Sequence, residues 1–129
     1  MKLREIIKEE LKVIYEYISI PNEIVKKYSK DVFDNKPKLY HITTQFAPKE
    51  TNTKYYGTTI KFKVVAYGVS DLAEAVKVKI ISEIPFKLKD NLHITLTFKN
   101  KPVDSNYITN WKPVKDETIY EGIFNGFVK

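Results

Sequence analysis

Hydrophobic positions follow a helical period at the start of the chain. Between residues 2 and 18 they recur at three- and four-residue steps, and charged residues fill the opposite side. This spacing predicts an amphipathic helix whose apolar face packs on the core. Pro21 follows its end, and Asn22 can cap a second helix that runs to about residue 33. The apolar positions of the first helix are Leu3, Ile6, Ile7, Leu11, Val13, Ile14, Tyr17 and Ile18.

After residue 38 the pattern changes to the two-residue alternation that is typical of strands. Residues 107–111, just before a proline, predict a short helical turn. The links between the strands are too short for crossover helices, so the sheet is expected to be mostly antiparallel. The sequence therefore predicts an α+β fold, in which an N-terminal helical part (1–33) packs on a mostly antiparallel sheet (38–128). The expected strands cover residues 38–47, 58–68, 74–82, 92–99 and 118–128.

One hexapeptide occurs twice, on two of these strands. Residues 41–46 read His-Ile-Thr-Thr-Gln-Phe, residues 93–98 read His-Ile-Thr-Leu-Thr-Phe, and the only two histidines of the chain open the two copies. Alternate side chains of a strand share a face, so each copy places its histidine and the threonine two residues later on one polar face. The residues between them, together with Phe46 in the first copy and Phe98 in the second, are expected to face the core.

Composition and charge limit the class of protein. A chain of 129 residues with 43% hydrophobic residues suits one globular domain, spanning residues 1–129. The 22 Lys and Arg against 16 Asp and Glu favour an anionic partner such as RNA or a nucleotide. The absence of cysteine excludes disulfides and thiolate metal sites. No apolar stretch approaches the length of a membrane span, so a cytoplasmic protein without a membrane partner is expected.

The repeated motif can perform acid–base chemistry on a phosphate ester. Two imidazoles on either side of a phosphorus atom can divide the work, because one takes a proton from water while the other gives a proton to the leaving oxygen. Thr43 and Thr95 would offer hydroxyl donors to the phosphate oxygens. Threonine and glutamine, the other residues of the polar faces, are poor zinc ligands, so neither a metal nor another cofactor is expected.

Two His-x-Thr motifs on apolar-backed strands resemble the 2H phosphoesterase superfamily, which includes the LigT-type RNA phosphodiesterases. The resemblance rests on residues 39–46 and 91–98. It implies metal-independent hydrolysis of RNA or nucleotide phosphodiesters, most familiarly of 2′,3′-cyclic phosphates. By this likeness His41 and His93 are the acid–base pair, and Thr43 and Thr95 hold the phosphate. The resemblance also implies a compact version of the superfamily fold.

Residues around the motifs suggest further contacts with a substrate. Aromatic side chains in loops can stack on a base, and lysines near the motifs can attract phosphate. Two alternatives stay open: a phage-type hydrolase of cyclic di- or oligonucleotide defence signals, and a non-catalytic module that binds RNA or a nucleotide. The candidate substrate-binding residues are Tyr55, Tyr56, Lys99, Lys101 and Trp111.

Overall fold

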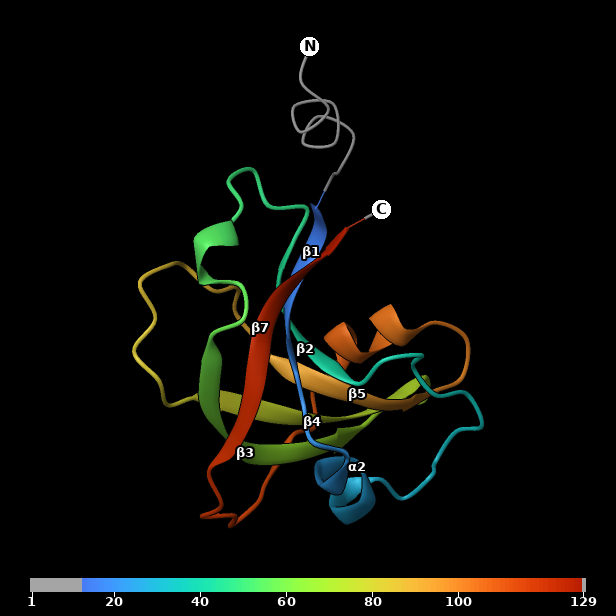
Figure 1. The fold of residues 1–129 in the computed structure, drawn as a ribbon. Coiled ribbons are helices and arrows are strands. Elements are labelled where there is room, and N and C mark those ends of the chain that lie inside the picture. Colours follow the sequence, from blue (N-terminus) through green and yellow to red (C-terminus); the bar gives the residue numbers. More distant parts are fainter. Residues whose placement is uncertain (1–12, 129) are drawn as a thin grey trace.

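The chain folds into a closed antiparallel barrel of six strands (Figure 1). The computed structural model describes residues 13–128. Hydrogen bonding runs around the barrel in the order β4-β5-β2-β1-β7-β3, and β3 pairs with β4 to close it. Closure removes the exposed edges that an open sheet would have. The six strands are β1 (Val13–Ser19), β2 (His41–Phe46), β3 (Thr59–Val69), β4 (Ala73–Ile80), β5 (His93–Phe98) and β7 (Tyr120–Val128).

Little of the described chain is helical, and the predicted α+β fold is wrong. A seven-residue helix, α2 (Asn22–Tyr28), and two 3₁₀ segments, η1 (Thr53–Tyr55) and η2 (Pro102–Tyr107), accompany the barrel, and a two-residue strand, β6 (Lys112–Pro113), pairs with β3. The helical turn expected over residues 107–111 lies earlier, in η2. Within residues 13–128, no helix has the length and apolar character needed to cross a membrane.

The helix predicted over residues 2–18 is contradicted where it can be compared. Residues 13–19 form β1, and residues 2–12 lie outside the described part of the chain. This segment is rich in β-branched and aromatic residues, which suit a strand that is paired on both sides. β1 pairs with β2 on one edge and with β7 on the other, so tertiary pairing overrides the helical spacing. The second helix is shorter than predicted and ends at Tyr28.

The barrel interior is an apolar core. Buried residues alternate with less buried ones along β1, β2, β3 and the first half of β7, as the two-residue period predicts, whereas consecutive residues are buried in β4 and β5. Helix α2 lies at one end of the barrel and contributes Ile24, which is fully buried (Figure 1). The largest buried apolar side chains are Phe62, Phe124, Ile18, Ile24, Ile42, Ile94 and Leu96.

The barrel is built from two equivalent three-strand halves. Strands β1, β2 and β3 correspond to β4, β5 and β7. When the two sets are exchanged, every pairing among the six barrel strands is reproduced: β1–β2 matches β4–β5, and β1–β7 matches β4–β3. In the β1–β2 pair Ile18 lies opposite Ile42, and in the β4–β5 pair Val76 lies opposite Ile94. The register shifts at the same place in both pairs, just after Glu16 in β1 and just after Glu74 in β4. The repeated hexapeptide is thus the visible part of a larger structural repeat.

Each half contains one buried glutamate at this equivalent place. Glu16 is 1% exposed and accepts hydrogen bonds from the backbone and side-chain amides of Asn52, at 2.7 and 2.8 Å, and from the Tyr56 hydroxyl. Glu74 is fully buried and accepts four hydrogen bonds, from the segment after α2, from β3 and from β5. Both carboxylates therefore fasten connecting segments to the barrel wall.

Candidate active site

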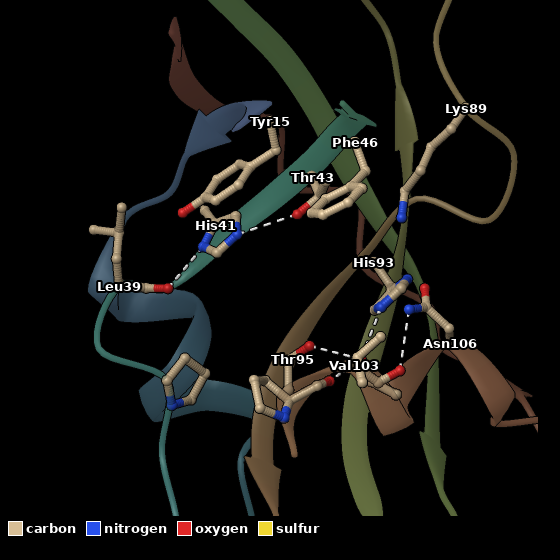
Figure 2. Close-up of a pocket in the computed structure, with 13 residues that line it drawn as sticks. Tyr15, Leu39, His41, Thr43, Phe46, Lys89, His93, Thr95, Val103 and Asn106 are labelled. Carbon is tan, nitrogen blue, oxygen red and sulfur yellow. Dashed lines mark hydrogen bonds between the residues drawn. The ribbon is translucent and has the colours of Figure 1, made fainter. Parts of the chain in front are cut away.

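The two histidine motifs lie on neighbouring strands. β2 pairs with β5 through Ile42 and Ile94, which occupy the same position in the two copies of the hexapeptide. In antiparallel strands the register runs in opposite directions from such a pair, so His41 lies toward Thr95 and Thr43 toward His93. A local twofold axis therefore passes between the two motifs. All four side chains line one pocket of about 550 Å³ (Figure 2).

Both imidazoles are held in the same way through their Nδ1 atoms. Nδ1 of His41 lies 2.7 Å from the carbonyl oxygen of Leu39, and Nδ1 of His93 lies 2.8 Å from the carbonyl oxygen of Asn91. A carbonyl oxygen only accepts, so Nδ1 carries the proton in each ring. Nε2 of the neutral ring is then free to accept a proton. The shared contact two residues upstream gives the two histidines the same tautomer.

The surroundings of Nε2 differ between the two motifs. In the first motif Nε2 of His41 lies 3.1 Å from the hydroxyl of Thr43. In the second, the hydroxyl of Ser105 stands between the equivalent groups, 2.9 Å from Nε2 of His93 and 2.7 Å from the hydroxyl of Thr95. Ser105 is 1% exposed and comes from η2. Its hydroxyl can donate to neutral His93 or, when His93 is protonated, to the Pro102 carbonyl oxygen 2.9 Å away.

The pocket is lined by both polar and apolar side chains. The apolar ones include Phe46, which is 69% exposed and faces the pocket instead of the core, contrary to the prediction from alternation. The register shift between Glu16 and Tyr17 disturbs the pairing of β1 with β2 just before the Tyr15–Phe46 pair, where a strict two-residue period is not expected to hold. The Tyr15 ring stacks on the imidazole of His41, with 5.3 Å between the ring centroids. Other apolar residues of the lining are Pro37, Leu39, Pro102 and Val103.

The charged groups at the pocket are all basic. Among the described residues that line it, Lys89, His41 and His93 can carry positive charge, and none is acidic. Burial lowers the pKa of His41 and of His93 below the ordinary value, and the nearby Lys89 charge lowers both further. The pocket is therefore suited to an anion. Over residues 13–128, no three His, Cys, Asp or Glu residues gather closely enough to hold a metal ion.

None of the five candidate substrate-binding residues lines the pocket. Tyr55 packs against Phe86 in the core, and Tyr56 is tied to Glu16. Of the remaining three, Lys99 and Lys101 follow the end of β5, and Trp111 lies next to Lys77 of β4. Lys99 and Lys101 are exposed, and Trp111 packs in a small second core, where its ring lies under the ammonium group of Lys77.

Among the lining residues that sequence reasoning missed, Tyr15, Lys89 and Ser105 act on the histidines. Tyr15 was assigned to a helix, so its position beside the motifs could not be foreseen. Lys89 and Ser105 lie in connecting segments, where the two-residue period gives no information on direction. No short pattern in the sequence distinguishes them from other lysines and serines. Comparison of the chain with protein-family models and with curated protein sequences found no match.

Proposed function

We propose that the protein is a metal-independent phosphodiesterase that acts on RNA or nucleotide phosphodiesters, with 2′,3′-cyclic phosphates as the foremost substrates. The observation that carries this proposal is the pair of imidazoles with the same tautomer that line one pocket, among whose described lining residues none is acidic. Since RNA and nucleotides are intracellular, the cytoplasm is the proposed place of action.

The reaction would use the two histidines in opposite protonation states. Neutral Nε2 of one ring removes a proton from water as the water oxygen forms a bond to phosphorus. The protonated second ring gives its Nε2 proton to the ribose oxygen as the bond between that oxygen and phosphorus breaks. Thr43 and Thr95 donate hydrogen bonds to the non-bridging oxygens, on which negative charge increases. Atoms and protons balance without any further reactant.

The apolar part of the pocket lining supports a substrate that carries a flat body next to its phosphate. Phe46, which is exposed, offers an aromatic face on which a nucleobase can stack. A pocket of about 550 Å³ lies within the size range of small-molecule sites. This size supports a mononucleotide or the terminal nucleotide of an RNA chain as the occupant.

The test is a hydrolysis assay with metal-free protein in EDTA. The panel contains 2′,3′-cyclic nucleotides, short RNAs that end in a cyclic phosphate, and cyclic dinucleotides. We expect turnover of the first two classes, and we expect His41→Ala and His93→Ala each to lower kcat by about 10²–10⁴-fold. The double variant should lose little more than either single variant, because the two groups act as one unit.

A matched control is Gln45→Ala, which changes the first motif strand at a residue outside the pocket lining. It should leave kcat within about twofold of the unaltered protein, a change of less than 0.5 kcal/mol. Near-normal turnover in either histidine variant would contradict the mechanism. Turnover only of cyclic dinucleotides would favour the defence-signal hydrolase. Binding across the panel without turnover would identify a nucleotide-binding module instead.

A further inference from the structure

Among the described residues that line the pocket, Lys89 alone carries an ammonium group, and the mechanism above does not use it. It belongs to the connection between β4 and β5, where its backbone N–H donates to the Thr44 carbonyl oxygen at 2.9 Å and fastens the connection to β2. The side chain is half-buried, and its ammonium group points into the pocket beside Phe46 and His93 (Figure 2).

This ammonium group has no carboxylate partner within the described part of the protein. The ion pairs formed there involve Lys27, Lys36 and Lys63, and the pocket lining contains no acidic residue. Burial lowers the pKa of Lys89, which shows that the protein environment disfavours its charge. A partly buried cation that lacks a counter-ion is stabilised when an anion enters the pocket.

Lys89 also acts on both imidazoles at once. Its positive charge lowers the pKa of His41 and of His93. The other groups that face His41 are the Leu39 carbonyl, the Thr43 hydroxyl and the rings of Tyr15 and Tyr17.

His93 has a partly different set of neighbours. It is faced by the Asn91 carbonyl, the Ser105 hydroxyl, His41 and Lys77. Among the lysines of residues 13–128, Lys89 is therefore the one whose charge reaches both rings, whereas the charge of Lys77 reaches His93 alone.

We propose that Lys89 is a catalytic residue whose ammonium group binds the non-bridging oxygens of the phosphodiester and stabilises the negative charge that increases on them in the transition state. This role rests on the proposed function for the reaction itself. Lys89 stays protonated throughout, so it makes and breaks no covalent bond. A fixed cation at the place where charge develops is among the largest contributions that a protein can make to a phosphoryl reaction.

The first part of the test measures turnover of adenosine 2′,3′-cyclic phosphate by three variants. Lys89→Met keeps the apolar stem and removes the charge, Lys89→Arg keeps the charge, and Lys87→Met removes an exposed charge two residues away in the same connection. We expect Lys89→Met to lower kcat/KM by about 10–100-fold, the effect of one hydrogen bond to a charged group. The arginine variant should recover at least part of this loss, and Lys87→Met should leave the rate unchanged.

The second part needs no turnover and follows the two histidine rings by NMR as pH changes. Lys89→Met should raise the pKa of both His41 and His93, because it removes a positive charge near both. Lys77→Met should raise the pKa of His93 only. Binding of inorganic phosphate, followed by the same ring signals, should weaken about 10–100-fold in Lys89→Met and stay unchanged in Lys87→Met.

The two parts separate this inference from the proposed function. Raised histidine pKa values and weakened phosphate binding in Lys89→Met, without turnover in any variant, would support Lys89 as the anion-binding residue and remove the proposed reaction. Turnover that is unaffected in Lys89→Met would support the reaction and overturn the role of Lys89. Unchanged histidine pKa values in a folded Lys89→Met variant would also overturn that role.

Discussion

Replacement of the buried Glu74 should separate the effect of its shape from the effect of its hydrogen bonds. Oε2 accepts from the Lys30 backbone N–H at 2.8 Å and from the Tyr67 hydroxyl, and Oε1 accepts from the hydroxyls of Ser29 at 3.2 Å and Thr97 at 2.8 Å. In Glu74→Ala all four donors lose their acceptor inside the protein. Removal of one partner from such a buried network costs about 3–5 kcal/mol of unfolding free energy.

Glu74→Gln should cost much less, for a geometric reason. Its remaining oxygen can face Lys30 and Tyr67, which donate, while its amide faces Ser29 and Thr97, whose hydroxyls can rotate to accept. We expect a loss of about 1–2 kcal/mol, close to one charge-assisted hydrogen bond. At about 4 °C per kcal/mol, the melting temperature should fall by about 4–8 °C in Glu74→Gln and by about 12–20 °C in Glu74→Ala.

Thermal unfolding followed by circular dichroism measures both values, and urea unfolding gives the free energies independently. Glu16 provides the matched comparison, because it occupies the equivalent place in the other half and accepts three hydrogen bonds instead of four. Glu16→Ala should therefore destabilise by a similar amount. A melting temperature of Glu74→Ala within about 3 °C of the unaltered protein, or equal losses in the alanine and glutamine variants, would refute the reasoning.

Two further predictions concern the histidines. Ser105→Ala should lower kcat by about tenfold with little change in KM, because one hydrogen bond of about 1.4 kcal/mol to His93 is lost. NMR should show a changed titration of His93 but not of His41. A change in KM alone would contradict this role. Because burial lowers the pKa of both histidines, the unfolded chain binds more protons than the folded protein once pH falls below 6.5. The stability that the neutral histidines contribute should therefore be complete above that pH and should decrease as pH falls below it, with a smaller slope in His93→Gln; equal slopes in urea titrations would count against the lowered pKa.

The sequence predicted the strands well where the two-residue period was clear. The five strands expected after residue 38 all form, with bounds that differ by a few residues, and the two motif strands lie side by side. The repeat was also informative, because equal local patterns placed on paired strands bring equal groups together. These features depend on local geometry, which a single chain segment already contains.

Features that depend on distant parts of the chain could not be predicted. The spacing of apolar residues before residue 19 fits a helix, and only the pairing of β1 with β2 and β7 makes a strand more favourable. Glu16 and Glu74 are charged residues that sequence alone would place on the surface, yet their burial depends on donors that lie 23 or more residues away, apart from Tyr67. Trp111 was expected near a substrate, but its contacts with Ile108 and Gly68 make it a packing residue.

The place of β7 in the barrel affects the order in which the protein can fold during synthesis. β1 leaves the ribosome first among the six strands and β7 leaves last, yet the two lie side by side (Figure 1). Until β7 arrives, one edge of β1 has no partner, and exposed strand edges favour aggregation. The stacking contact between the rings of Tyr15 and Phe127, whose centroids lie 5.0 Å apart, forms only at that last step. Tyr15 lines the pocket, so the pocket wall is completed only when the last strand has docked.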